Sequence, residues 1–556
     1  MRHLGRLGHS LAAGAFAGAA LAPVQLLLWE DVRLPLAKAS LACLAWATWG
    51  SLWLGLFYFV VLEMFALVPA NLLGRDGFSL PLWRRLMAAN SLLVASVAVW
   101  NRHETRDLLL PANRQALAVV AWLAGLYGIV LLVLVLRRTS RLRSPAIAWG
   151  ASTLLVAALW GIWAMTPPAA PPLAGTDTPT FKAARNLLFV SWEGADLPWL
   201  LPILERGDMP FLQSRRDRGA WGQLRTMRPY TRSASLATVV TGCAPAVHGV
   251  LGKRSYRLSW LLDHPVTLLL AGPWRDPHQV PWAAWERVPG ASPKRAPIWA
   301  ILDRSGRPAG NAGWPRWSTG GWDLQAPLAA DATRFEELDS ELQAALSPAL
   351  ATAPGAARDA RRAFAIASDL HQAVLQRTES GTMGALVVNT RLVSQLRPAW
   401  TPAAPGDPSD ETLRQAARLL DDQVHQLWSR LGGEATLLVV VSPYGMAPPS
   451  PWRRLGHLVG HTSEWRVSPS ESPDGFVLFS GPGVRPGERL RARRLADVVP
   501  TVLYLLELPV ARDMVGGVIL EAVTDEHTAR VPLRRVASYP PTVPDTPHRT
   551  PQPDAR

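Results

Sequence analysis

The sequence contains very little cysteine, with only Cys43 and Cys243 in 556 residues. Cys43 lies in a strongly apolar run and Cys243 in a polar stretch rich in small residues, and the chain has no CxxC or Cys/His cluster. These features exclude a disulfide framework and a cysteine-based zinc site. Cysteine usage therefore says little about the cellular compartment.

Acidic residues are also scarce relative to basic ones, since 43 Asp and Glu face 57 Lys and Arg and leave a formal charge of +14. The basic residues are mostly arginines that are scattered along the chain, partly in short loops between apolar runs. A nucleic-acid-binding surface gathers such residues into a patch or stripe. We therefore expect no nucleic-acid partner.

The N-terminal third contains five apolar segments, each near the roughly 20 residues that cross a bilayer core. We predict five transmembrane helices, at Leu7–Leu28, Ala39–Leu67, Leu82–Trp100, Leu117–Leu136 and Ala146–Met165. None has a central acidic or histidine residue with flanking partners, which argues against a transporter. The segments are expected to form an anchor in the lipid bilayer, or alternatively a groove for a lipid-linked substrate. A cleaved signal peptide is the alternative for the first segment.

Arginine placement predicts the orientation of these segments. The short loop Arg137–Arg143 is strongly basic, which is typical of a cytoplasmic loop. Counting from this loop, the N-terminus is also cytoplasmic, and everything after the fifth segment is extracytoplasmic. We expect a multi-pass protein of a bacterial inner (plasma) membrane whose C-terminal domain faces the periplasm.

The remainder of the chain predicts one large domain. We expect a membrane domain at 1–166, a Pro-rich linker at 167–180, an α/β domain at 181–530 and a disordered Pro-rich tail at 531–556. Short apolar runs such as ATLLVVVS (435–442) alternate with amphipathic helical patterns, for example at Asp410–Leu431. This alternation is typical of a doubly wound α/β fold with a mainly parallel sheet.

The stretch 186–252 carries the most chemistry. An apolar strand, LLFVS, runs into a turn that contains Glu193 and Gly194, and a helix rich in hydroxyl groups begins near Thr231. A carboxylate at the end of a strand, followed by the N-terminus of such a helix, is how an open α/β sheet builds an anion or metal site.

Five pieces of the C-terminal domain resemble the alkaline phosphatase superfamily, in particular its type I phosphodiesterase/nucleotide pyrophosphatase branch, to which sulfatases are similar. They are LLFVSWEGAD, TGCAPAVHG, APIWAILDRSGRPAGNAGWP, ATLLVVVSPYGM and the stretch from GFVLFSGPG to DMVGGVIL. The layout of five spans and an outer domain also resembles lipoteichoic acid synthases and lipid A phosphoethanolamine transferases. The resemblance implies a site with two divalent metal ions that acts on phosphoric or sulfuric esters.

The positions that would carry this chemistry depart from the family pattern. The resemblance places Glu193 at the position of an aspartate ligand and Arg232 at that of the nucleophile. The Asp-His-Gly expected after the 435–442 strand is Pro443-Tyr444-Gly445, and 390–400 contains neither Asp nor His. Because two dications need anionic ligands to overcome their mutual repulsion, we predict a pseudoenzyme with no cofactor. It is expected to bind an anionic ligand, an envelope glycolipid or a membrane protein partner in envelope biogenesis.

Two alternatives remain open at this site. An active ester hydrolase or phosphotransferase with two zinc or manganese ions would use a remodelled set of residues, drawn from Glu193, Glu471, His457, His461, Thr231 and Ser233. In the pseudoenzyme, Arg232 and the backbone at Gly194 would bind an anion, or Arg232 would instead pair with Glu193. His248 is expected to stabilise a turn, Asp196 to cap a helix, and Tyr444 to point toward the site or to pack.

Overall fold

The computed structural model describes residues 2–28, 34–66, 82–136, 145–167, 181–228, 230–251, 254–257, 284–287, 293–315, 317, 322–324, 354–379, 383–396, 408–446 and 473–539. They fall into two compact units. One is Met1–Pro171 with Leu251–Val288, and the other is Pro172–Val250 with Pro289–Arg556. Three candidate metal ligands, His457, His461 and Glu471, lie outside the described residues.

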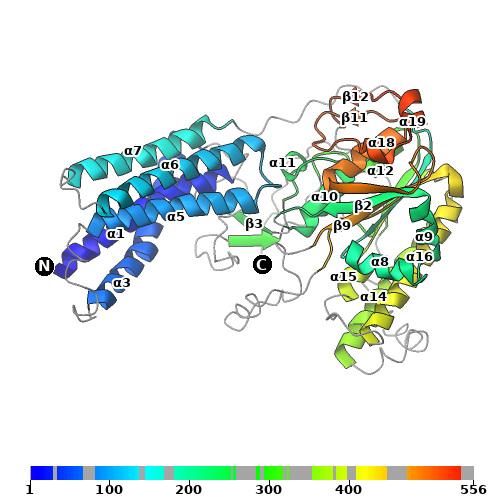
Figure 1. Cartoon of the computed structure of the whole chain (residues 1–556), viewed down its shortest axis with the longest axis horizontal. Helices are drawn as coiled ribbons and strands as arrows, with labels where there is room; N and C mark the ends of the chain where they lie inside the picture. Colours follow the sequence, from blue (N-terminus) through cyan, green and yellow to red (C-terminus); the bar gives the residue numbers. More distant parts are fainter. Residues whose placement is uncertain are drawn as a thin grey trace, which may run out of the picture. The chain divides into compact units, whose positions relative to one another are not determined.

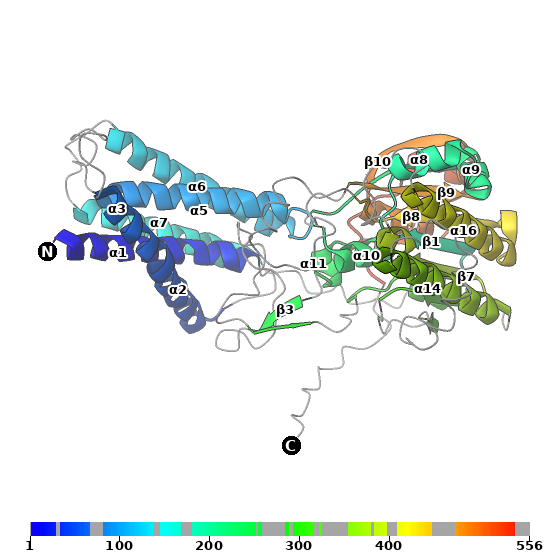
Figure 2. The same cartoon turned by 90° about the horizontal axis from the view of Figure 1, so that it is seen from below.

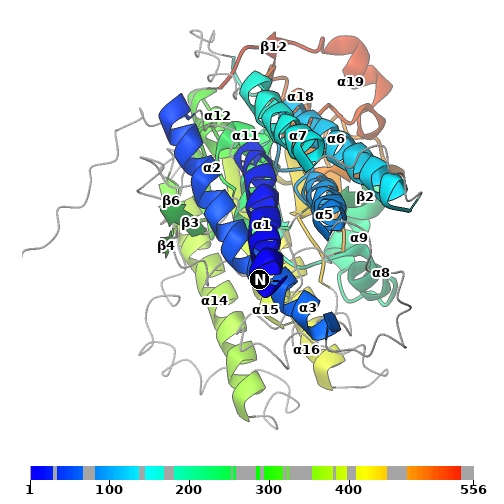
Figure 3. The same ribbon diagram turned by 90° about the vertical axis from the view of Figure 1, so that its left-hand side faces the viewer.

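The first unit is helical, and α1 lies among the other helices (Figure 3). Its helices are α1 (Arg2–Leu27), α2 (Leu36–Gly50), the π-helical turn η1 (Ser51–Gly55), α3 (Leu56–Ala66), α5 (Leu82–Glu104), α6 (Pro111–Leu136) and α7 (Pro145–Met165). A short antiparallel pair, β3 (Arg254–Arg257) and β4 (Ala284–Arg287), also belongs to this unit. The described parts of the five segments predicted to cross a membrane are therefore almost entirely helical.

Three of these helical stretches are long and apolar enough to cross a membrane: Leu7–Leu27, Leu36–Val61 and Pro111–Leu136. The apolar part of α7, Trp149–Met165, is shorter. Large apolar side chains on α6, among them Trp122 and Leu126, are more than half exposed. A membrane-spanning helix exposes such residues to lipid, so the N-terminal unit is a helical region with about three candidate spans.

The α1–α2 packing depends on glycines. A Cβ atom on Gly14 would lie 2.3 Å from the carbonyl oxygen of Gly50, and one on Gly18 would lie 1.9 Å from that of Trp46. Small residues permit this close approach of two backbones, as is common between membrane helices.

The second unit is built on an eight-stranded sheet, in the order β10-β2-β9-β8-β1-β7-β5-β6. The strands are β1 (Asn186–Trp192), β2 (Gly219–Arg225), β5 (Ala309–Ala312), β6 (Trp322–Leu324), β7 (Ala385–Thr390), β8 (Thr436–Ser442), β9 (Gly475–Ser480) and β10 (Glu488–Arg494). Only β9 runs antiparallel to its neighbours. Strands β1, β7 and β8 are almost wholly buried and apolar, as central parallel strands require.

Helices cover both faces of this sheet (Figures 1 and 2). One face carries α8 (Leu197–Glu205), α9 (Pro210–Asp217), α14 (Pro354–Glu379), α15 (Leu392–Leu396) and α16 (Pro408–Arg430), whose apolar residues form one continuous core with β1, β7 and β8. The other face carries α10 (Arg232–Thr241), α12 (Ile298–Arg304) and α18 (Val498–Leu505). Short elements complete the unit: α11 (Pro245–His248), η8 (Gly433–Ala435), η9 (Leu495–Asp497), β11 (Val510–Ala511), η10 (Leu520–Ala522), α19 (Asp525–Arg530) and β12 (Arg535–Val536). The predicted doubly wound α/β domain is present.

The C-terminal segment is a correction to the sequence-based expectation. Residues 531–539, expected to begin a disordered tail, pack onto the domain, because β12 pairs with β11 and the Tyr539 hydroxyl donates to the Pro509 carbonyl at 2.7 Å. The Ser538 hydroxyl donates to Asp513, which also pairs with buried Arg295. Hydrogen bonds, rather than a periodic pattern of apolar residues, therefore hold this segment on the domain.

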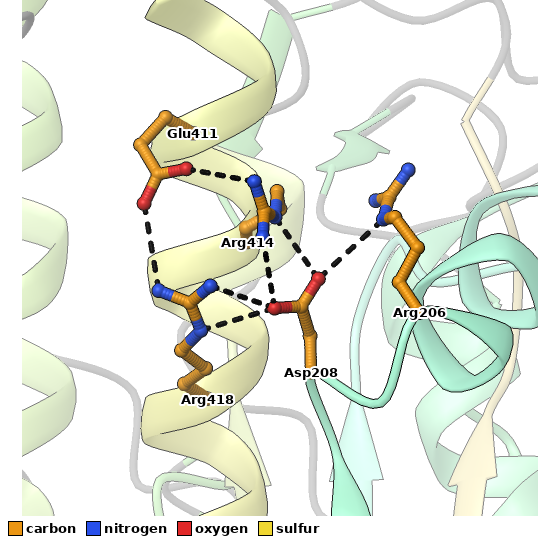
Figure 4. Close-up of polar contacts among 5 residues, drawn as sticks. All are labelled: Arg206, Asp208, Glu411, Arg414 and Arg418. Carbon is orange, nitrogen blue, oxygen red and sulfur yellow. Dashed lines mark hydrogen bonds and ion pairs between the residues drawn. The ribbon is translucent and has the colours of Figure 1, made fainter. Parts of the chain in front are cut away.

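Asp208, in the turn between α8 and α9, attaches α16 to the domain (Figure 4). Its carboxylate accepts hydrogen bonds from Arg414 at 2.9 Å and from Arg418 at 2.7 Å, and Arg206 lies at 3.5 Å. Glu411 pairs with both Arg414 and Arg418. Hydrogen bonds from Arg414 above all, and also from Arg418, lower the pKa of Asp208 to about 2.

We expect Asp208→Asn to lower the free energy of unfolding at pH 7, because it removes the negative charge that pairs with Arg414 and Arg418. Since these partly exposed arginines are screened by solvent, the loss should be about 1–2 kcal/mol. The folded pKa lies below the unfolded value of about 3.9. The contribution of Asp208 is therefore complete above pH 4 and is lost as the pH falls toward 2. Denaturation of both proteins at pH 7 and pH 3 measures this difference. Asp217→Asn, which removes an exposed pair with Arg216, is the control and should change stability little at either pH.

Candidate functional site

The parallel strands β1, β7 and β8 are adjacent, so their carboxyl ends meet at one edge of the sheet. This edge is where open α/β sheets bind ligands. Glu193 directly follows β1, Asn389 is the penultimate residue of β7, and Tyr444 follows β8. Arg232 is the first residue of α10. The fold therefore brings four polar side chains from four distant segments together.

Glu193 is the centre of this arrangement and is fully buried. The Arg232 guanidinium donates from Nε to Oε2 and from Nη2 to Oε1, each at 2.5 Å. The Asn389 amide donates to Oε1 at 2.7 Å, and the Tyr444 hydroxyl donates to Oε2 at 2.8 Å. Both carboxylate oxygens are thus committed to protein donors.

The ionisation of the pair follows from these contacts. Burial raises the pKa of Glu193, but the charge and hydrogen bonds of Arg232, the Asn389 amide and the charge of Arg391 together outweigh it, and the pKa is lowered. Burial lowers the pKa of Arg232, and the carboxylate of Glu193 raises it overall. Burial, together with the charge of Glu193, raises the pKa of Tyr444. At neutral pH the site contains a charged ion pair beside a neutral phenol.

The backbone at Gly194 fixes the turn that presents Glu193. Gly194 has a φ of +87°, and a Cβ there would meet the Ser394 Cα and the Met446 sulfur, each at 2.8 Å. Asp196 caps α8 by accepting from the Trp199 N–H at 2.9 Å and also accepts from the Met446 N–H at 3.2 Å. The expectation that Asp196 is a helix cap is confirmed.

His248 stabilises a turn, as expected. Its Nδ1 accepts from the Val250 N–H at 3.1 Å, so its Nε2–H donates to the Thr238 hydroxyl at 3.0 Å. Complete burial lowers its pKa to about 3, and the ring is therefore neutral. Both ring nitrogens are engaged in structural hydrogen bonds.

The hydroxyl candidates lie at the start of α10. Thr231 is the N-cap residue of this helix, yet its side chain makes no capping hydrogen bond. Its Oγ1 atom is buried and has no hydrogen-bond partner among the described residues. Ser233 is partly buried. Among the described residues, no three of His, Cys, Asp and Glu lie together as metal ligands.

A pocket of about 270 Å³ lies beside the ion pair. Arg232, Asn389, Thr390, Arg391 and Gln395 contribute its polar side. The remaining wall is mostly apolar and is formed by Gly313, Trp314, Pro315, Ala363, Ile366, Ala367, Leu370 and Leu392. All of these residues belong to the second unit.

The sequence patterns did not identify Asn389 and Arg391, because neither is an Asp or a His of the kind that the family resemblance implies as metal ligands. The available signal was a polar residue ending an otherwise apolar strand, ALVVN, followed by an arginine. Tyr230 was also missed; its ring centroid lies 4.4 Å from that of Tyr444.

We expect Arg232→Met to lower the free energy of unfolding by about 3–5 kcal/mol, since it leaves a buried carboxylate without its cation. The double variant Glu193→Gln/Arg232→Met should lose clearly less. In the native protein the pKa of Glu193 is depressed, so this group contributes less as the pH falls through its folded pKa. In Arg232→Met, burial should raise that pKa, and stability should instead increase as the pH falls from 7.5 to 5.

Unfolding of the detergent-solubilised chain at these two pH values measures both effects. A loss below about 1 kcal/mol in Arg232→Met at pH 7.5, or equal losses in the single and double variants, would show that the ion pair is not a principal contributor.

Comparison with known proteins gives a family match and several distant structural likenesses. No curated protein sequence matches the chain. Murine ectonucleotide pyrophosphatase/phosphodiesterase 5 is 13% identical, with a TM-score of 0.35 over 58% of this chain and 95% of its own. A phosphonate monoester hydrolase from Silicibacter pomeroyi is 14% identical, with a TM-score of 0.36 over 60% of this chain and 76% of its own. The alkaline phosphatase PafA is 11% identical, with a TM-score of 0.41 over 63% of this chain and 100% of its own.

The family comparison covers the strands and helices that build the site. Residues 188–466, half of the chain, match the family described as type I phosphodiesterase/nucleotide pyrophosphatase. The match begins in β1 and includes Glu193, α10, β7 and β8. The chain belongs to the type I phosphodiesterase/nucleotide pyrophosphatase family of the alkaline phosphatase superfamily.

Proposed function

We propose that this chain is a membrane-anchored protein of phosphodiesterase fold that binds an anionic ligand and does not use di-metal catalysis. The observation that carries the proposal is the state of Glu193. Both of its oxygens accept hydrogen bonds from Arg232, Asn389 and Tyr444, and its charge is balanced by a guanidinium. A carboxylate in this state has no free oxygen to offer as a metal ligand.

The residues present do not fit the pair of divalent cations that the family implies. Divalent metals bind carboxylates, neutral imidazoles and thiolates. Around Glu193 the structure places a guanidinium, an amide and a phenol whose pKa is raised. Arg232 would also repel a dication directly. No step of a reaction is therefore assigned to metal ions at this position.

The pocket beside the ion pair supports ligand binding instead. The charges of Arg232 and Glu193 cancel, and the neighbouring Arg391 adds a positive charge to the pocket wall. A guanidinium in a partly enclosed site is well suited to phosphate, sulfate or carboxylate groups. The ligand is proposed to be an envelope glycolipid or an anionic group of a membrane protein partner, in envelope biogenesis.

A second candidate function is an ester hydrolase that uses Thr231 or Ser233 as nucleophile. The observation in its favour is the buried Thr231 hydroxyl, which has no described partner at the N-terminal end of α10. Its metal ligands would have to include residues outside the described ranges, such as Glu471, His457 and His461. Metal content separates this candidate from the first.

We expect the purified full-length protein, dialysed against zinc and manganese and then freed of loose ions, to retain far less than one metal ion per chain. We also expect no hydrolysis of bis(p-nitrophenyl) phosphate above the uncatalysed rate. Elemental analysis and absorbance measure these two quantities. About two ions per chain together with hydrolysis that Thr231→Ala or Ser233→Ala abolishes would favour the hydrolase.

We further propose that the N-terminal unit crosses the membrane five times and places the phosphodiesterase-fold domain outside the cytoplasm, in the periplasm of a bacterium. The three long apolar helices and the basic loop Arg137–Arg143 support this orientation. Protease added to spheroplasts should then digest the C-terminal domain and leave a cytoplasmic marker intact. Full protection of this domain until the membrane is permeabilised would contradict the orientation.

A further inference from the structure

The edge of the sheet formed by β2 and β10 carries a concentration of exposed arginines. In the register of these two strands, Trp221 lies beside Arg489. Four residues further along β2, Arg225 lies beside Arg494, so all of these side chains share one face of the sheet. The three arginines are exposed, and so is Arg491 at the register shift of β10. These four arginines form what we call the edge cluster.

Few carboxylates balance the edge cluster. Arg225 and Arg494 are neighbours across the two strands, where like charges repel each other. Arg494 lies 3.7 Å from Asp497, whose two oxygens already accept hydrogen bonds from backbone N–H groups. Arg225, Arg489 and Arg491 form no ion pair within the described part of the chain. The cluster therefore leaves positive charge exposed at this edge.

The other acidic side chains at this edge do not remove that charge. Glu521 pairs with Arg493 at 2.5 Å. Asp474 accepts a hydrogen bond from the Gln223 side chain at 3.0 Å. Glu488, the first residue of β10, lies on the opposite face of the strand, since successive side chains alternate. An anion from outside the domain is thus the available partner for the edge cluster.

Apolar side chains are exposed next to these arginines. Within the described residues of the second unit, the large apolar side chains that are exposed are Val515, Leu520 and Leu533. Val515 is 47% exposed and Leu520 is 55% exposed, and both belong to the loop 514–522. Trp221 is partly exposed, and the Arg489 guanidinium lies 5.6 Å from its ring centroid, which is a cation–π contact.

The loop 514–522 is fixed beside β10 by hydrogen bonds. The Gly517 N–H donates to Asp497, just beyond the end of β10, at 2.9 Å. The N–H of buried Ile519 donates to the Thr501 hydroxyl at 2.9 Å. The short helix η10, which begins at Leu520, contacts both β10 and β2. The fold therefore holds the exposed apolar side chains in place next to the edge cluster.

From these observations we infer that the β2–β10 edge docks the α/β domain on the anionic phospholipid surface of the bilayer in which the chain is anchored. The edge cluster would contact the headgroups, and Val515 and Leu520 would enter the boundary between headgroups and acyl chains. The inference rests on the membrane anchor of the proposed function, for which the chain has three candidate spans. It does not depend on what the pocket beside Glu193 binds.

The combination of charge with apolar surface favours a bilayer over a soluble polyanion. A soluble polyanion would be held by the arginines alone, and its binding would gain little from Val515 or Leu520. A lipid surface uses both kinds of contact, because headgroups supply the negative charge and the interface accepts apolar side chains. An anchored domain also meets its own membrane at a high effective concentration, so weak docking is sufficient.

Quenching by lipid measures this contact directly. The full-length chain, with Cys43 and Cys243 replaced by alanine, is labelled at Leu520→Cys with an environment-sensitive fluorophore and placed in lipid nanodiscs. The discs contain phosphatidylcholine with a spin-labelled lipid, either without anionic lipid or with about 30% phosphatidylglycerol. We expect at least about twofold stronger quenching in the anionic discs. Raising NaCl from about 0.1 M to about 1 M shortens the Debye length from about 10 Å to about 3 Å and should remove most of the difference.

A label at Ser429→Cys is the positional control. Ser429 is exposed in the last turn of α16, which precedes β8 and so lies toward the amino ends of the parallel strands. Leu520 lies beside β10 and Val515 near its carboxyl end. Quenching of the label at position 429 should not depend on phosphatidylglycerol.

Variants separate the arginines from the apolar side chains. Arg225→Gln with Arg491→Gln should weaken docking about tenfold or more. Arg362→Gln with Arg377→Gln is the matched control, because it removes two exposed charges from α14 and should change docking less than about twofold. Val515→Ser should weaken docking about threefold or more. Circular dichroism establishes that each variant is folded.

Equal quenching of the label at position 520 in neutral and anionic discs would overturn the inference. So would equal weakening by the two arginine pairs, or native quenching in the variant of the edge cluster. The arginines would then be explained as charges that keep an edge strand from pairing with other chains. A chain that does not co-elute with the discs would overturn the membrane anchor as well, whereas metal content and anion binding report on the pocket separately.

Discussion

The buried charge of Glu193 is the constraint on which the domain depends. A carboxylate with no exposed surface carries a large desolvation cost, which only a close counter-ion and additional hydrogen bonds can offset. Here a guanidinium, an amide and a phenol supply them from α10, β7 and the segment after β8. Three separate parts of the chain must therefore fold correctly before the residue that follows β1 can remain ionised.

The sheet determines which residues can meet in this way. Strand β1 lies between β7 and β8 and is parallel to both, with Ser191 opposite Asn389 and Val441. Residues at the carboxyl ends of these strands are consequently neighbours, although Glu193 and Tyr444 lie 251 residues apart in sequence.

Sequence patterns predicted buried strands such as β1 and β8 well, because their strongly apolar runs have few alternatives. They missed β2 and β10 near the sheet edge, where GAWGQLR and ERLRARR lack apolar continuity and depend on pairing with neighbours. The ordered residues 531–539 were missed for a related reason, since tertiary hydrogen bonds such as that of Tyr539 leave no local pattern. At the site, sequence motifs located Glu193, Arg232 and Tyr444. Their mutual contacts, and the participation of Asn389, required the fold.

Glu193 and Arg232 form one physical unit. A buried arginine at the start of α10 without the carboxylate would be an unpaired cation, and the carboxylate without the arginine would be an unpaired anion. Each residue balances the charge of the other, so the pair is electrically neutral. The positive charge that then remains at the pocket, within the described residues, is that of Arg391. In the proposed function, this balance of charge makes the pocket better suited to an anion than to a cation.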